Sequence, residues 1–326
     1  MIVFSFVESL SAVYAERFLS GVFAAAVTPI AAAAIGDFAA TGHERARRLA
    51  FVSMAGIAGF LLGPMLSVFV SRFAATVFTI NQPSGSLKIP LAATALLAIL
   101  TGVAVAFAVP RGRRRDQIKK VSIVSVDRNP WVVPTLLVLT FIASTGIGVF
   151  EVGLALRGKQ ELGLTPYQIA LMFSECSLVM FVVQAIVFSP GIKPDITRWL
   201  ISPALAVLAG GLFFVPWASD FALMLAVVGT VAASAGILSP ILTYWISSKA
   251  GSAQGWELGK QTAAASLGVT LGSAAGGLLF NVAALPGASF VFAAALAALG
   301  FVLSLRLPRG LVTRHFADSA VTSETP

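Results

Sequence analysis

The chain has 326 residues, of which 57% are hydrophobic and only 11% are charged, and its formal net charge is +8. Soluble domains carry about 25% charged residues, so this composition excludes an ordinary soluble enzyme. The basic residues fall in short segments between apolar runs, which favours membrane topology over nucleic-acid binding. Because Cys176 is the single cysteine and both histidines lie in polar stretches, disulfide scaffolds and His-ligated metal sites are also excluded.

Apolar stretches long enough to cross a bilayer recur along the whole chain. A spanning helix needs about 20 predominantly apolar residues. Nine stretches of this kind are bounded by charged residues, Pro or Gly: 17–36, 49–71, 89–109, 132–155, 167–189, 198–217, 221–246, 260–280 and 287–305. A shorter apolar piece, 1–14, is interpreted as part of a further span. The sequence therefore predicts an all-α, polytopic membrane protein with nine full spans and one partial span.

The distribution of basic residues predicts the orientation of these spans. If successive loops alternate between the two sides of the membrane, seventeen of the 22 Lys and Arg residues fall on one side and four on the other, and Arg17 lies within a span. Cytoplasmic loops of membrane proteins carry an excess of Lys and Arg. We therefore expect loops 37–48 and 110–131 and the C-terminus to be cytoplasmic.

The longest polar segment divides the chain into unequal parts. This segment, 110–131, contains the run RGRRRDQIKK and is interpreted as a solvated linker, with binding of anionic lipid head groups as the alternative. The predicted organisation is an incomplete N-terminal helical bundle over 1–109, the cytoplasmic linker, a C-terminal six-helix bundle over 132–306 and a disordered cytoplasmic tail over 307–326.

An internal repeat relates the two parts. Three glycine pairs align at offsets of 208 and 209 residues: Gly21 with Gly229, Gly59 with Gly268, and Gly63 with Gly272. Many transporters are built from duplicated bundles, and at this offset the first part lacks two complete spans and half of a third. The repeat therefore predicts an N-terminally shortened version of a twelve-span protein.

Five stretches carry a resemblance to a known family. They are RFLSG at 17–21, HERARR at 43–48, GIAGFLLGP at 56–64, LGLTPYQI at 162–169 and GVTLGSAAGG at 268–277. In this order they resemble the fourth helix, the loop before the fifth helix, the antiporter motif of the fifth helix, the loop between helices seven and eight, and the eleventh helix of the major facilitator superfamily. The likeness is to its drug:proton antiporter branch, which includes multidrug and tetracycline efflux proteins, without the first two helices and part of the third.

The resemblance implies a two-bundle helical fold and secondary active transport. The expected activity is proton-coupled efflux of a small amphipathic drug or metabolite by alternating access, in the bacterial cytoplasmic membrane. We expect a small-molecule substrate, protons and the lipid bilayer as partners, with no nucleic acid, no cofactor and a monomeric state. The alternative is a truncated, non-transporting remnant or a mis-called start of such a transporter. An enzyme is disfavoured because no span carries a metal-ligand cluster or a nucleophile with a histidine base.

Glycines in the motif helices are predicted to pack helices closely. A residue without Cβ lets two helix backbones approach, and a proline bends its helix. The residues to which the resemblance assigns antiporter-motif packing are Gly21, Gly59, Gly63, Pro64, Gly268 and Gly272. The alternative is that these are the ordinary glycines of membrane helices.

Ionisable residues inside the spans are candidates for proton coupling, because charges are costly in the membrane and mark functional sites. Desolvation disfavours the charged carboxylate, so Glu175 and Glu151 can bind and release a proton there. The alternatives are a satisfied polar contact between helices for either residue and, for Glu151, reaching to the interface. Arg17 stays charged, so it either biases a neighbouring carboxyl or forms a salt bridge that holds two helices.

Amide and aromatic side chains are candidates for lining a substrate cavity. Gln184, Tyr244 and Gln261 have the mixed polar and apolar character that amphipathic compounds need. Trp245 and Trp256 lie near the expected cytoplasmic boundary, so we expect them in the interfacial aromatic belt, with a cavity role as the alternative.

Overall fold

The computed structural model describes residues 11, 14–15, 18–23, 27, 30–31, 44, 47–59, 62, 85–108, 131–187, 189, 197–249, 254–280, 282 and 287–307. The chain divides into two compact units, one formed by 1–27 with 59–128 and the other by 28–58 with 129–326. Throughout the described residues all regular secondary structure is helical. The predicted all-α fold is therefore confirmed.

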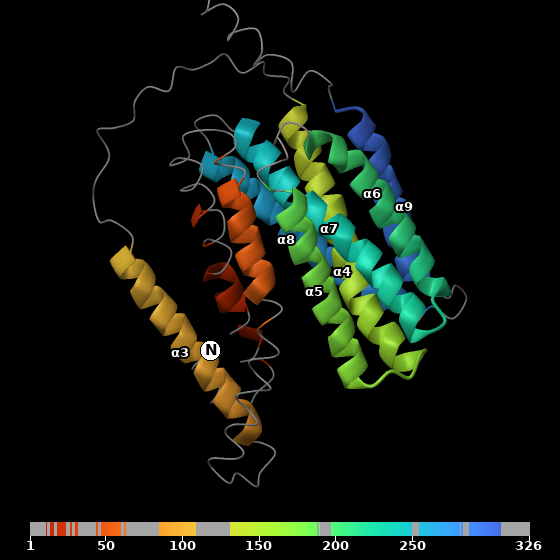
Figure 1. Ribbon diagram of the computed structural model, residues 1–326, viewed down its shortest axis with the longest axis horizontal. Helices are drawn as coiled ribbons and strands as arrows, with labels where there is room; N and C mark the ends of the chain where they lie inside the picture. The colour runs from red at the N-terminus through yellow and green to blue at the C-terminus, as the bar shows by residue number, and fades with distance from the viewer. Residues whose placement is uncertain are drawn as a thin grey trace, which may run out of the picture. The chain divides into compact units, whose positions relative to one another are not determined.

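Among the described residues, the long helices whose two ends are given are α3 in the first unit and α4 to α9 in the second (Figure 1). In the first unit α3 covers Gly85–Ala108. The helices of the second unit are α4 (Val132–Gln160), α5 (Pro166–Val187), α6 (Arg198–Phe214) with the 3-10 helix η3 (Val215–Trp217), α7 (Phe221–Lys249), α8 (Gln254–Phe280) and α9 (Ala288–Leu305). Among the described residues, α4 to α9 are the helices long and apolar enough to cross a membrane.

The described helices begin and end within a few residues of the predicted spans, and α4, α7 and α8 extend beyond them. The span predicted to end at 155 continues to Gln160, and the span predicted to begin at 260 begins at Gln254. Charged residues set the predicted ends, whereas a helical backbone continues beyond the apolar core of a bilayer into the interface. The span predicted at 49–71 is described in part, with 47–59 helical. The predicted linker and tail lie outside the described residues, apart from Trp131 and Leu307.

The motif LGLTPYQI forms the turn that starts α5. Gly163 has a φ of +59°, a left-handed conformation that glycine adopts without strain. Thr165 Oγ1 accepts a hydrogen bond of 3.3 Å from the backbone N–H of Gln168, and the backbone N–H of Thr165 donates to Gln168 Oε1 at 2.9 Å. With Pro166 between them, these bonds form a capping box that satisfies donors at the helix start. The motif therefore acts here as a helix-starting signal.

In the second unit, α5 to α9 all contact α4. This helix contacts α8 most extensively and also touches α7 and α9. Its fully buried side chains include Leu139, Phe150 and Leu154. A Cβ added to Gly153 would lie 2.5 Å from the ring of Phe290, which α9 contributes to the same core. The absence of a side chain at Gly153 therefore allows the ring of Phe290 to pack directly against α4.

Exposed tryptophans lie at helix ends. Trp131, Trp199 and Trp256 stand at the starts of α4, α6 and α8, and Trp217 stands at the end of η3. Tryptophan collects at membrane–water interfaces, so these positions fit a bundle that crosses the bilayer. Trp256 is 71% exposed, as a belt position requires, but Trp245 is only 4% exposed. The prediction that Trp245 lies in the interfacial aromatic belt was wrong, because its side chain is buried in the helical bundle.

Candidate functional site

The first-unit candidates are described only in part. Arg17, Gly63 and Pro64 lie outside the described residues. Gly21 and Gly59 lie in helical segments, where an added Cβ would meet no described atom within 4 Å. The coupling and packing roles of all five residues stay predictions.

Glu151 and Glu175 lie within α4 and α5, and both side chains are half-buried. Cys176 follows Glu175 directly on α5, and its side chain is also half-buried. Glu175 Oε1 lies 3.4 Å from the position that a Cβ on Gly229 of α7 would occupy. Its Oε2 is buried with no hydrogen-bond partner in the described part of the chain. A carboxyl in this setting can bind and release a proton, provided that the bundle opens to water.

The three predicted cavity residues lie in the same bundle. Gln261 Nε2 on α8 donates a 2.7 Å hydrogen bond to Thr243 Oγ1 on α7. Tyr244 is buried, and its ring meets Trp245 edge-on with centroids 5.5 Å apart. Gln184 on α5 is fully buried. The structure therefore places these polar groups on α5, α7 and α8, and their substrate role stays a prediction.

Glycines of α8 pack directly on the backbone of α4. A Cβ added to Gly268 would lie 2.5 Å from the carbonyl oxygen of Phe141, and one added to Gly272 would overlap the carbonyl oxygen of Thr145. One turn further, a Cβ on Gly276 would lie 3.1 Å from the carbonyl oxygen of Val149. Glycines spaced four residues apart form one stripe along a helix. This stripe lets α4 and α8 touch backbone to backbone.

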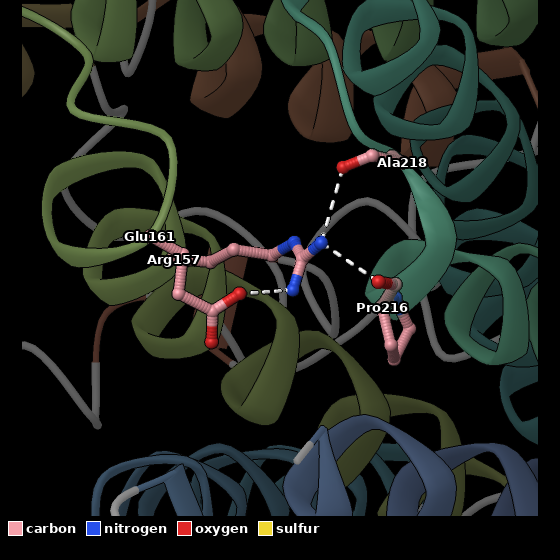
Figure 2. Close-up of polar contacts among 4 residues, drawn as sticks. All are labelled: Arg157, Glu161, Pro216 and Ala218. Carbon is pink, nitrogen blue, oxygen red and sulfur yellow. Dashed lines mark hydrogen bonds and ion pairs between the residues drawn. The ribbon is translucent and has the colours of Figure 1, made fainter.

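Arg157 is a structural residue that the sequence analysis counted only as an external charge. It is buried near the end of α4, where its guanidinium pairs with the carboxylate of Glu161 (Figure 2). Its Nη2 donates hydrogen bonds of 2.7 Å to the Pro216 carbonyl and 3.1 Å to the Ala218 carbonyl. The i, i+4 spacing with Glu161 predicts the ion pair. The two carbonyls come from the α6–α7 connection, so only the fold reveals that Arg157 joins it to α4.

Replacing Arg157 by Gln should lower the stability of the protein by about 2 kcal/mol, because charged hydrogen bonds are lost and two carbonyls lose their donor. The measurement is the thermal unfolding midpoint of purified protein in detergent. Glu161→Gln is the control: the Glu161 side chain is 40% exposed, so this variant should lose less than about 1 kcal/mol. Equal losses in both variants would show that the ion pair, and not the carbonyl contacts, stabilises this end of α4.

The described residues contain no cluster of potential metal ligands. Within them no group of three or more His, Cys, Asp or Glu side chains could hold a metal ion. The polar groups described above are carboxyls, amides and a thiol among apolar helices. Such groups can bind protons and small polar atoms of a solute.

Three bacterial proteins are similar to this chain over most of its length. Multidrug resistance protein 2 of Bacillus subtilis (strain 168) is 26% identical over 295 residues, which cover 86% of this chain and 69% of that protein. Multidrug resistance protein 1 of the same organism is 26% identical over 308 residues, covering 91% and 74%. Quinolone resistance protein NorA of Staphylococcus aureus (strain COL) is 22% identical over 278 residues, covering 84% and 68%.

A solved structure and a family profile agree with these relatives. The crystal structure of the human organic anion transporter MFSD10 (TETRAN) superposes with a TM-score of 0.68 at 18% identity, covering 93% of this chain and 73% of that one. This likeness concerns the fold alone. The profile of the Major Facilitator Superfamily matches residues 1–256. This multi-pass membrane protein therefore belongs to the Major Facilitator Superfamily.

Proposed function

We propose that this protein exports a small amphipathic drug or metabolite in exchange for protons. The observation that carries the proposal is the placement of two half-buried carboxyls, Glu151 and Glu175, within helices that are long and apolar enough to cross a membrane. Ionisable groups are retained in spans where they serve transport or pairing. The names of the three bacterial relatives, two multidrug resistance proteins and a quinolone resistance protein, support drug export as the direction of transport.

The mechanism is alternating access between two helical bundles. A proton that enters from outside neutralises a carboxyl, and a neutral carboxyl can be enclosed in the apolar bundle at low cost. Release of that proton to the cytoplasm restores the charge, which favours the conformation that exposes the group to water. Arg17, which lies outside the described residues, is proposed as the electrostatic partner of the carrier carboxyl. Gln184, Tyr244 and Gln261 are proposed to contact the substrate.

The proposed setting is the bacterial cytoplasmic membrane, with the C-terminus in the cytoplasm and the protein acting as a monomer. The excess of Lys and Arg on one side of the predicted spans supports this orientation. Exposed tryptophans at both ends of the helices support a transmembrane arrangement.

Proton movement in everted membrane vesicles tests the proposal. Respiration acidifies the vesicle interior, and a pH-sensitive dye reports the gradient. If drug uptake into the vesicle is exchanged for protons, adding a transported compound should reduce the gradient within seconds. Vesicles without the protein are the control. If no compound in a broad panel of amphipathic drugs moves protons in vesicles that contain the folded protein, proton-coupled export is wrong.

A further inference from the structure

A proline interrupts α7 in its inner half. Pro240 lies inside the helix Phe221–Lys249. Because proline has no backbone N–H, the carbonyl of Gly236, four residues earlier, receives no hydrogen bond from position 240. Within a membrane bundle such a carbonyl needs a donor from a neighbouring helix.

Two contacts between α5 and α7 define which residue faces this interruption. Glu175 lies against Gly229, and Met180 Cα lies 3.0 Å from the position of a Cβ on Gly236. Because both contacts advance in the same direction, the two helices run parallel. One helical turn beyond Met180 is Gln184, and one turn beyond Gly236 is Pro240. Gln184 therefore lies level with the proline.

The amide of Gln184 lacks partners in this arrangement. The residue is 0% exposed, and neither its Nε2 nor its Oε1 has a hydrogen-bond partner among the described residues. The same holds for Trp245 Nε1 and Ser247 Oγ, both buried in the part of α7 that follows Pro240. Buried polar groups are normally paired, so the unpaired amide of Gln184 beside an interrupted helix needs an explanation.

The contacts that α7 makes with α5 and with α8 lie on opposite sides of Pro240. Before Pro240, Gly236 packs on the backbone of α5 at Met180. After Pro240, Thr243 accepts the hydrogen bond from Gln261 of α8. The close backbone contact with α5 thus lies before the proline and the hydrogen bond to α8 lies after it, while α6 also packs against α7. Bending at Pro240 would carry the inner part of α7 together with α8.

We propose that Gln184 is a positioning residue that fixes a second conformation of α7. When α7 bends at Pro240, Gln184 Nε2 donates a hydrogen bond to the carbonyl oxygen of Gly236. This bond stabilises the bent form and so regulates how the inner ends of α7 and α8 open. The inference rests on the proposed transport function for the purpose of the motion, whereas the bond itself depends only on the fold.

A double-mutant cycle read by cysteine alkylation tests this pairing. All variants carry Cys176→Ala and Ser248→Cys, which places a single thiol at a half-buried position in the last turn of α7. The alkylation rate by a membrane-impermeant maleimide reports opening of the inner end. Gln184→Met removes the donor, so the rate should fall by about threefold to tenfold, the effect of one hydrogen bond.

Pro240→Ala supplies the missing backbone N–H to Gly236, so in that background Gln184→Met should change the rate by less than about twofold. An equal fall in both backgrounds, or no fall with Pro240 present, overturns the proposal. Gln168→Met is the matched control, since this amide lies on the same helix but bonds to Thr165, and its rate should be unchanged. If Gln184→Met does not accumulate in the membrane, Gln184→Asn replaces it, because the shorter amide cannot reach the carbonyl.

The alkylation assay needs neither a drug nor a proton gradient. If the effect of Gln184→Met depends on Pro240 while the protein moves no protons in the vesicle assay, that combination would support the inference and refute the proposed function. Additive effects in a protein that does move protons would refute the inference alone.

Discussion

Replacing Glu175 by Gln should reduce drug export driven by a proton gradient by about 100-fold or more, which is the size of effect that loss of a proton-transferring group has in other proteins. The amide has nearly the same shape as the carboxyl and fits the same space against Gly229, so the variant should insert and fold normally. Exchange of labelled drug without a gradient should continue, because it needs no net proton movement. The measurement is gradient-driven uptake into everted vesicles beside gradient-free exchange.

Two further amide variants are compared with Glu175→Gln. Glu151→Gln tests the second candidate carboxyl, and Glu257→Gln is the control. Glu151 is the other proposed proton carrier and lies within the spanning helix α4, so its amide variant should also lose gradient-driven export. Glu257 lies at the start of α8, where its carboxylate pairs with Lys260 at 2.7 Å, and its amide variant should export normally. If Glu175→Gln exports at the full rate while Glu151→Gln does not, Glu151 alone carries the proton. If both amide variants export normally, neither carboxyl is the carrier.

Replacing Gly272 by Ala should destabilise the protein by about 3 kcal/mol, at the upper end of what overpacking costs. An added Cβ would overlap the Thr145 carbonyl oxygen, a backbone atom that cannot rotate away, so α8 must move off α4. Alanine also favours helix by about 1 kcal/mol relative to glycine, but this gain is smaller than the cost of separating the closest helix pair in the bundle. Thermal unfolding in detergent and the amount of monodisperse protein are the measurements.

Gly259→Ala is the matched control on the same helix. An added Cβ at Gly259 meets no described atom within 4 Å, so only the helix-propensity gain remains and the unfolding midpoint should rise or stay unchanged. A midpoint for Gly272→Ala equal to that of Gly259→Ala would contradict the close packing of α4 and α8.

The two carboxyls of the proposed site belong to different helix pairs. Glu151 is on α4, which glycines join to α8, and Glu175 is on α5, which contacts α7 at Gly229 and Gly236. Close glycine contacts hold each pair together. A shift of one pair against the other therefore changes the distance between the carboxyls, which would couple protonation to conformation.

The positions of the membrane helices follow from the sequence with small errors at the ends. The runs at 132–155 and 221–246 predict α4 and α7, and the helices differ from them by a few residues at one end. This works because transfer into lipid depends on local composition, and because a spanning segment must satisfy its own backbone hydrogen bonds. Glu151 and Glu175 are predicted as proton carriers in the same way, as rare charges within apolar runs, and this role stays a prediction.

Contacts between helices were decided only by the tertiary structure. Nothing in the sequence shows that Arg157 reaches the carbonyls of Pro216 and Ala218, or that Trp245 turns inward while Trp256 faces outward. Likewise, Gln184 lies at the same height as Pro240 only because α5 and α7 pack in parallel with this register. Composition determines which segments enter the bilayer, whereas shape complementarity between distant surfaces determines which faces meet, and no local pattern contains that information.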